Sequence, residues 1–417
     1  MRFFWKFIKR QTVQIRNGGA LTISNKLKKI YPHIIFFPLY VLAFPIVIFI
    51  RLLAPIILIR WYGIVASRIG TFAANIELYL CEKECGINVP NKSHFDIIFI
   101  EQLPVCNKQL YLMWKRVLRI WPRFIFYPIM IVNKIIPGGG SHEFSVSSID
   151  RDVNNLYDKT SPHLFFTKEE EEKGAQGLLD LGIPKKSKFV CLIVRDNAYL
   201  PNLDYHSYRD GDINSYVLAA EELASRGFYV IRMGVMVNQP INSQNSKIID
   251  YASNGSRSDF MDIYLGAKCT FCLTSATGYD AIPTIFRKPL ALVSVPVGYI
   301  STFSKNFLSI TKHHMSLIDG HELTFDEIFD KNVAFALSSE NFKENEVYLV
   351  DNSPEEIRDL AIEMDDHING YLDQESEDRK DIYKKKYLNY LNKDQKKLRG
   401  NIKSLFSSRF LEKNTFF

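Results

Sequence analysis

Apolar and polar positions alternate along the middle of the chain in a pattern that predicts strands and helices in turn. Four short apolar runs, rich in β-branched residues, are predicted strands: residues 189–194, 228–232, 270–274 and 289–295. Between them, residues 212–226 and 258–267 have apolar side chains at helical spacing. Strands that are apolar on both faces and alternate with helices predict a parallel sheet covered by helices on both sides.

The rest of the chain has a less regular pattern. In its first half we predict a helix over residues 67–80, a helical stretch over 115–136 with breaks at Pro122 and Pro128, and strands over 95–100 and 109–114. Residues 167–181 and 354–370 read as helices, and 375–410 as one long basic helix or a pair. A chain of 417 residues is too long for one ordinary core. We therefore expect an N-terminal segment (1–60), an N-terminal domain (61–180), a C-terminal domain (181–350) and C-terminal helices (351–417).

Charge sets the N-terminal segment apart. No Asp or Glu precedes Glu77, whereas the first 29 residues carry Arg2, Lys6, Lys9, Arg10, Arg16, Lys26, Lys28 and Lys29. Residues 34–50 and 52–59 are apolar but broken by prolines, and neither reaches the roughly 20 residues of a transmembrane helix. A distorted span, a surface-lying insertion and core packing all remain open. We favour peripheral or monotopic attachment to the cytoplasmic face of an inner membrane, with the membrane surface as a partner.

The six cysteines predict no metal centre. Cys191, Cys269 and Cys272 fall in or beside predicted strands, which suits small core residues in a reducing compartment. Four cysteines, Cys81 and Cys85 with Cys269 and Cys272, have spacings open to a zinc site. However, side chains on one strand alternate between faces, so the second pair would diverge.

Polar residues gather where the predicted strands end, and we predict an anion site there. Parallel sheets bind ligands at the carboxyl ends of their strands, and a small hydroxyl-rich turn before a helix exposes N–H groups to phosphate. Neighbouring arginines would supply counter-charge to a diphosphate. The candidate donor-binding residues are Arg195, Asp196, Arg209, Asp212, Arg232, Gly234, Thr274, Ser275, Thr277, Gly278 and Asp280. The alternative is that the arginines are solvated or pair with Asp210, Asp212 or Asp259, and that the turn is only a helix cap.

The order of motifs resembles a family of bacterial glycosyltransferases from surface-polysaccharide gene clusters. The matching runs are Ser67-Arg-Ile-Gly70, Asn75-x-Glu77-Leu-Tyr-Leu80, Val194-Arg-Asp196, Arg209-x-Gly-Asp212, Tyr229-Val-Ile-Arg-Met-Gly234, Ile249-Asp-Tyr-Ala252, Arg257-Ser-Asp-Phe-Met-Asp262 and Asp280-Ala-Ile-Pro283. The resemblance implies a GT-B fold of two Rossmann-like domains. It places a nucleotide sugar in the C-terminal domain and an acceptor in the N-terminal one.

One departure from that family concerns the catalytic base. Related enzymes often have Gly-His in the acceptor loop, whereas Thr71 follows Gly70 here. We expect Glu77 to be the base instead; the alternative is a structural ion pair with Arg68 or Lys83.

These observations predict a glycosyltransferase of polysaccharide, lipopolysaccharide or glycoconjugate synthesis. Its donor would be a nucleotide-diphosphate sugar, and its acceptor a carbohydrate or a lipid-linked sugar. We expect no cofactor and no obligatory metal, because no Asp-x-Asp motif ends a strand of the sheet domain. Nucleic acid is not an expected partner, since the tyrosines among the C-terminal lysines also suit a packed helix. The alternatives are a non-catalytic nucleotide- or nucleic-acid-binding protein at the membrane, and a nucleotide-sugar epimerase of GT-B fold.

Overall fold

A computed structural model describes residues 37–144, 151–198, 204–293, 306–371, 374–391 and 402–414, with Val297 and Ser304. The chain forms two compact units. The small unit comprises Met1–Ile64, Pro90–Glu101 and Arg119–Phe144, and the large unit comprises Val65–Val89, Gln102–Leu118 and Ser145–Phe417. The predicted basic segment at residues 1–29 lies outside the described residues.

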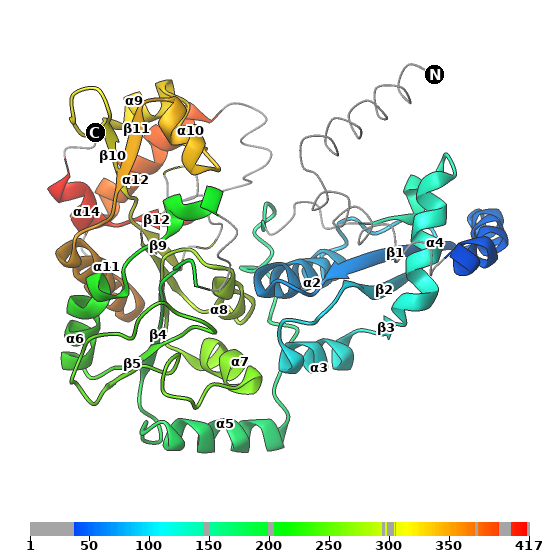
Figure 1. Cartoon of the computed structure of the whole chain (residues 1–417), viewed down its shortest axis with the longest axis horizontal. Coiled ribbons are helices and arrows are strands. Elements are labelled where there is room, and N and C mark those ends of the chain that lie inside the picture. Colours follow the sequence, from blue (N-terminus) through cyan, green and yellow to red (C-terminus); the bar gives the residue numbers. More distant parts are fainter. Residues whose placement is uncertain are drawn as a thin grey trace, which may run out of the picture. The chain divides into compact units, whose positions relative to one another are not determined.

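The large unit is built on a seven-stranded sheet in the order β12-β9-β8-β7-β4-β5-β6, and every neighbouring pair is parallel (Figure 1). Its strands are β4 (Phe189–Ile193), β5 (Tyr229–Arg232), β6 (Ile248–Ile249), β7 (Cys272–Thr274), β8 (Leu290–Leu292), β9 (Phe307–Ser309) and β12 (Leu405–Phe406). The four strands predicted from the apolar runs are therefore confirmed, as is the parallel α/β class.

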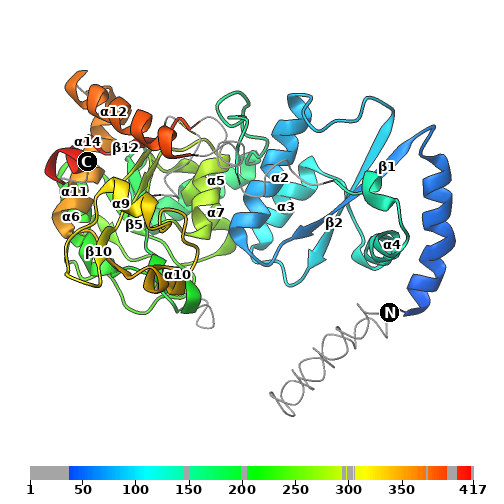
Figure 2. The same ribbon diagram turned by 90° about the horizontal axis from the view of Figure 1, so that it is seen from above.

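Helices cover both faces of this sheet (Figures 1 and 2). On one face, α6 (Val217–Ser225) and α11 (Pro354–Asn369) pack against each other and share a core with Val190 and Leu192 of β4. On the other face lie α7 (Asp259–Lys268) and α8 (Ala281–Ile285). Cys191, between those two core residues, interacts with Cys269 and Tyr279. Alternate side chains of β4 thus fill two different cores, which explains its unbroken apolar sequence.

Two helices from the first half of the chain belong to the large unit. The predicted helix at 67–80 is α2 (Ile69–Glu84), and the strand predicted at 109–114 is wrong because these residues lie in α3 (Lys108–Val117). Asn107 caps α3 by accepting the Leu110 N–H at 2.8 Å. Leu110, Met113 and Trp114 are its buried residues, at the spacing of one helical face.

The C-terminal residues complete the large unit. Instead of one long helix, the described part of this region contains α12 (Gln374–Tyr390), β12 and α14 (Ser408–Lys413). Buried Glu363 of α11 pairs with Lys380 at 3.2 Å and accepts the Ser408 N–H at 2.9 Å. Tyr383 and Tyr387 lie in the core, which confirms the packed reading of that helix.

The remaining elements are α5 (Lys168–Asp180), η2 (Asp204–Arg209), η3 (Ile213–Tyr216), η4 (Gly278–Asp280), β10 (His313–Ser316), α9 (Phe325–Asp330), α10 (Ser339–Glu344) and β11 (Val347–Val350).

The small unit has a three-stranded sheet in the order β1-β2-β3, formed by β1 (Leu58–Val65), β2 (His94–Gln102) and β3 (Ile120–Trp121). Residues 37–53 form a helix that shares a core with β1, β2 and α4 (Arg123–Ile135); η1 (Gly139–His142) follows α4. Arg60 of β1 and Asp96 of β2 form an ion pair at 2.8 Å. None of the described helices has both the length and the apolar character needed to cross a membrane.

Candidate active site

The strand order of the large unit reverses between β4 and β7. From β4 the chain continues to β5 on one side, and it later returns to place β7 on the other side. Open parallel sheets bind ligands outside the carboxyl ends of the strands at such a reversal. Arg195 follows β4, and Ser275 follows β7 directly. Two of the predicted residues therefore stand where the topology favours a ligand.

The loops after β4 and β7 are joined by hydrogen bonds. The Arg195 N–H donates to Ser275 Oγ at 2.7 Å, and the Ser275 N–H donates to the Ile193 carbonyl at 3.1 Å. The Arg195 carbonyl accepts the Gly211 N–H at 3.0 Å. Ser275 is buried. The backbone at Arg195 is thus fixed from two directions, which orients its side chain.

The turn after β7 contains a residue in an unfavourable backbone conformation. Ala276 has φ = 60°, in the left-handed region, which costs roughly 1–2 kcal/mol for a residue with a Cβ atom. Its carbonyl accepts a hydrogen bond from the Arg209 guanidinium. Thr277 caps η4 by accepting the Tyr279 N–H at 3.2 Å. Strain of this kind concentrates at ligand sites, and here Arg209 holds it in place.

The Asp280 side chain is hydrogen-bonded to a residue before the turn and to one within it. Its Oδ1 accepts the hydroxyl of Thr274 at 2.5 Å and the hydroxyl of Thr277 at 3.2 Å. Burial raises the pKa of Asp280 to about 6, although these two hydroxyls and Arg209 favour the charged form. A carboxyl group with a pKa so close to neutral pH is suited to proton transfer.

Positive charge collects beside this turn. Arg195 Nε donates to Asp210 Oδ1 at 3.0 Å, so the pairing that we considered as the alternative for this arginine is present. Buried Lys312 donates to the Asp210 carbonyl at 2.8 Å and forms an ion pair with Asp351 at 2.5 Å. Lys312 comes after β9 and was missed in the sequence, because we did not predict the strand that precedes it.

The start of α2 lies against the same turn. A Cβ atom on Gly70 would be 3.1 Å from the Gly278 carbonyl oxygen, which is tighter than most real Cβ contacts, so the glycine lets the two backbones approach closely without displacement. Arg68 at the N-cap makes no capping hydrogen bond with its side chain, and the first turn carries no acidic residue. The N-terminus of this 16-residue helix therefore keeps its uncompensated partial positive charge next to the Ser275–Gly278 turn.

Four other predicted residues shape neighbouring loops. Arg232 is 1% exposed; burial lowers its pKa, and its Nη1 pairs with Asp250 at 3.4 Å. A Cβ atom on Gly234 would lie 2.6 Å from a Val237 methyl group. Asp196 accepts the backbone N–H groups of Ala198 and Asn238, each at 3.0 Å, and Asp212 caps η3 at 2.9 Å.

Glu77 lies in a different part of α2 and is fully buried. Its Oε1 is 2.7 Å from Arg287 Nη2 and 3.1 Å from His163 Nδ1. The ion pair that we considered as an alternative therefore exists, but the partners predicted for it were wrong. Oε2 has no hydrogen-bond partner among the described residues. The role of Glu77 as the catalytic base stays a prediction.

Glu77, Cys81 and His163 have the composition of a metal site, since their ligand atoms lie within 4.8 Å of one another. The guanidinium of Arg287, 3.5 Å from Cys81 Sγ, already brings a cation into the cluster, which disfavours a metal ion there. The cluster is better explained as a buried ion-pair network.

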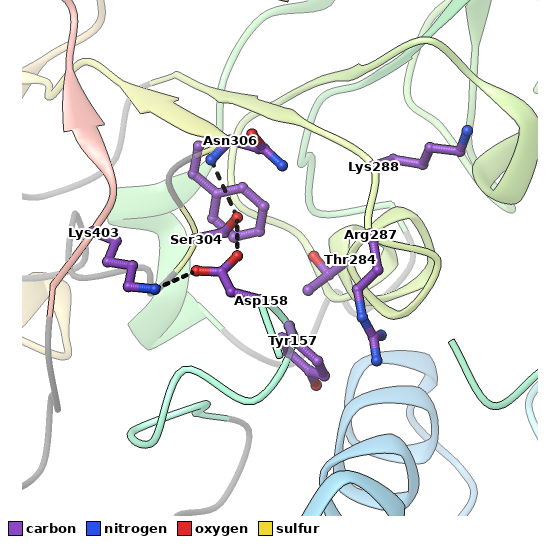
Figure 3. A pocket seen from close by; sticks show the side chains of 9 residues that line it. Tyr157, Asp158, Thr284, Arg287, Lys288, Ser304, Asn306 and Lys403 are labelled. Atoms are coloured by element: carbon purple, nitrogen blue, oxygen red, sulfur yellow. Dashed lines mark hydrogen bonds and ion pairs between the residues drawn. The ribbon is translucent and has the colours of Figure 1, made fainter. Parts of the chain in front are cut away.

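A cavity of about 340 Å³ opens at the opposite edge of the sheet (Figure 3). It is lined by residues that precede β8, β9 and β12, among them Lys288, Asn306 and Lys403, together with Tyr157 and Arg287. Asp158 in its wall pairs with Lys403 at 3.0 Å and accepts the Ser304 hydroxyl at 3.3 Å. Because the cavity lies at the amino ends of the strands, we place the candidate active site at the carboxyl ends instead.

Comparison with known proteins returns two solved structures. No protein-family model and no curated protein sequence matches the chain. A dodecameric iron-containing heptosyltransferase in complex with ADP-D-β-D-heptose aligns with 58% of this chain and 59% of its own, at 11% identity and a TM-score of 0.28. The E. coli ADP-heptose lipopolysaccharide heptosyltransferase II aligns over 74% of this chain and 100% of its own, at 11% identity and a TM-score of 0.33. Such TM-scores do not establish a shared fold, so function has to be argued from the chain's own residues.

Proposed function

We propose that the protein is a glycosyltransferase that uses a nucleotide-diphosphate sugar. One observation carries the proposal: Arg195, Arg209 and Lys312 gather around the loops after β4 and β7, at the point where the strand order reverses. A diphosphate is the anion that such a cluster suits, because two arginines can bind it through several hydrogen bonds.

In this proposal the protein stabilises the leaving nucleotide. Negative charge grows on the diphosphate as the glycosidic bond breaks. Arg195 and Arg209, the N–H groups of Ala276, Thr277 and Gly278 and the positive end of α2 would meet that charge with little rearrangement, since the backbone of this turn is already fixed. These groups supply the charge stabilisation from the chain itself. We therefore expect turnover to survive a chelator, and abolition by EDTA with recovery on adding a divalent ion would contradict this point.

Two carboxyl groups are candidates for taking the proton of the acceptor hydroxyl. Glu77 is fully buried and forms an ion pair with Arg287. Asp280 follows the Ser275–Gly278 turn, and burial raises its pKa to about 6. The variants Glu77→Gln and Asp280→Asn separate them. The base is the residue whose variant loses turnover while it keeps nucleotide binding. Loss of folding in Glu77→Gln would instead support a structural role.

The acceptor and the location extend this proposal. We infer a GT-B-like arrangement in which a carbohydrate or lipid-linked acceptor of lipopolysaccharide or another surface polysaccharide meets the donor. An acceptor of this kind suits a protein attached to the cytoplasmic face of the inner membrane. The basic first 29 residues support this location.

A thermal-shift screen against nucleoside diphosphates and nucleotide sugars tests the donor site. A ligand at about 100 times its dissociation constant adds about 2.7 kcal/mol to stability, which gives a shift of several degrees. Arg209→Ala should abolish the shift. Arg358→Ala should keep it, because Arg358 lies on α11 and its ion pair is with neighbouring Asp359. A wild-type protein that no nucleotide stabilises, or an Arg209→Ala variant with the full shift, would overturn the proposal.

The epimerase alternative differs in what the donor becomes. An epimerase converts the nucleotide sugar without an acceptor and releases no nucleoside diphosphate. Incubating the purified protein with the stabilising nucleotide sugar alone, and then with candidate acceptors, separates the two. Release of nucleoside diphosphate that depends on an acceptor would support transfer.

A further inference from the structure

The helix of residues 37–53 is apolar on nearly every side. It has no charged residue before Arg51. Ala43, Val47 and Ile50 form one buried stripe against the core of the small unit. On the remaining sides Leu42 is 63% exposed, Phe49 62% and Leu52 72%. A surface helix normally has a polar side toward water, so this helix lacks the pattern of a water-facing element.

The exposed apolar surface continues onto α4. Phe124 is 60% exposed and Ile135 is 74% exposed, at the two ends of that helix. Figure 2 shows the helix of residues 37–53 and α4 next to each other at the edge of the small unit, as their shared core requires. We call the outer sides of these two helices the apolar face. Large apolar patches on soluble proteins usually mark an interaction surface.

Arg51 fixes the two helices to each other. Its guanidinium donates to the Ile136 carbonyl at 2.8 Å and the Pro137 carbonyl at 2.7 Å. It also donates to Asn133 Oδ1, with Nε at 3.0 Å and Nη2 at 2.7 Å. These acceptors lie at the C-terminal end of α4, whose last carbonyls need partners. The apolar face is therefore a preformed surface of two fastened helices.

Charge indicates what covers this face. The small unit contains 14 Lys and Arg against three Asp and Glu, a net charge of +11. Eight of these basic residues belong to residues 1–29, outside the described part of the chain, and the described part of the unit has six Lys and Arg against the three acidic residues. Because the whole chain has a net charge of +6, the large unit has a net charge of −5. An apolar surface on a strongly basic unit complements an anionic bilayer, where acyl chains receive apolar side chains and headgroups receive cations.

We propose that the apolar face docks the protein on an anionic bilayer, with the helix of residues 37–53 lying in the membrane plane. The proposal rests on the membrane attachment in the proposed function and identifies the surface of the protein that contacts the membrane. It does not depend on the donor site. The buried stripe runs along the helix, so one side stays on the protein while the other enters lipid. The described part of this helix, residues 37–53, spans about 25 Å, which is short of a hydrocarbon core of about 30 Å.

Vesicle co-sedimentation of the full chain tests the proposal. The probes are vesicles that contain phosphatidylglycerol and vesicles of phosphatidylcholine alone. The wild type should bind the anionic vesicles and keep part of that binding in high salt, because apolar contacts are not screened. The double variant Phe44→Gln/Phe49→Gln should bind these vesicles at least about tenfold more weakly than the wild type, since it removes two large apolar side chains from the lipid contact. Glutamine suits an exposed helix position, so the fold should persist.

The matched control is Ile318→Gln/Ile382→Gln, which replaces two exposed apolar residues of the large unit, 71% and 65% exposed. It should bind vesicles like the wild type. Equal binding by the Phe44→Gln/Phe49→Gln variant would overturn the proposal and assign binding to the basic N-terminal segment. A wild type that binds no vesicles and forms dimers that this variant abolishes would identify a second copy of the chain as the occupant. The nucleotide thermal shift, measured on the same variants, reports on the donor site separately.

Discussion

Replacing Arg287 by methionine should expose how much the buried network around Glu77 stabilises the large unit. Arg287 Nη2 is 2.7 Å from Glu77 Oε1, 3.1 Å from Thr160 Oγ1 and 3.0 Å from the Ser161 carbonyl. Its guanidinium also lies 4.8 Å from the ring centre of Tyr157. Methionine keeps much of the side-chain volume but can make none of these hydrogen bonds.

The expected loss comes from the carboxylate that remains. Glu77 is fully buried, so Arg287→Met leaves its negative charge with the His163 ring 3.1 Å away, the His163 N–H at 3.3 Å and the Cys81 thiol at 3.8 Å. Removing one member of a buried ion pair typically costs 3–5 kcal/mol, and we expect about 3 kcal/mol because the histidine compensates in part. In the double variant Glu77→Gln/Arg287→Met no buried charge is stranded. Its loss should be smaller than that of Arg287→Met, by about 1–2 kcal/mol.

Urea unfolding of the wild type, both single variants and the double variant gives the four free energies of a double-mutant cycle. If Arg287→Met costs less than about 1 kcal/mol, or if the two single losses simply add, the network is not an ion pair of this strength.

Three further variants test other parts of the structure. Burial raises the pKa of Asp280 to about 6, above its unfolded value of about 3.9, so the contribution of Asp280 to wild-type stability should fall as the pH rises from 4 to 6. Asp280→Asn should remove that fall, which pH-dependent urea unfolding would show as a relative gain of roughly 2–3 kcal/mol by pH 7; an unchanged profile would contradict the burial argument. Gly70→Val should force α2 away from Gly278 and weaken the nucleotide thermal shift, and a full shift would show that this contact is not needed. Arg51→Met should lower the free energy of unfolding by about 1–3 kcal/mol and speed hydrogen exchange at the C-terminal end of α4. Unchanged exchange would show that the hydrogen bonds of Arg51 do not hold this end of the helix.

The sheet of the large unit could be predicted because its strands have an unusual sequence. Residues such as Val190 and Cys191 are buried on opposite faces, so the strand is apolar throughout and its boundaries stand out. The strand predicted at 109–114 failed because a short apolar run fits a helix as well. The Asn107 side chain favours the helix by capping its N-terminus, and the buried side chains of this segment have the spacing of one helical face.

The candidate site could be predicted where it depends on chain order. Ser275 comes directly after β7 and Arg195 two residues after the end of β4, and the carboxyl ends of parallel strands lie at the same end of the sheet. The pairing of Arg287 with Glu77, in contrast, joins residues 210 positions apart, and His163 comes from a third segment. The spacing of residues within one segment cannot predict contacts between segments that are far apart in the sequence. For the same reason the sequence did not reveal that Arg232 is buried beside Asp250.

The buried network and the candidate active site are linked through α2. Near its start, Gly70 lies against Gly278 in the turn after β7, and farther along Glu77 pairs with Arg287, two residues after the end of α8. The helix is therefore attached at two points to the segment that runs from this turn through α8. Rotation or sliding of α2 would have to break a buried ion pair, which is costly. We infer that the network fixes the position of the helix N-terminus, and with it the positive charge presented to a diphosphate at the Ser275–Gly278 turn.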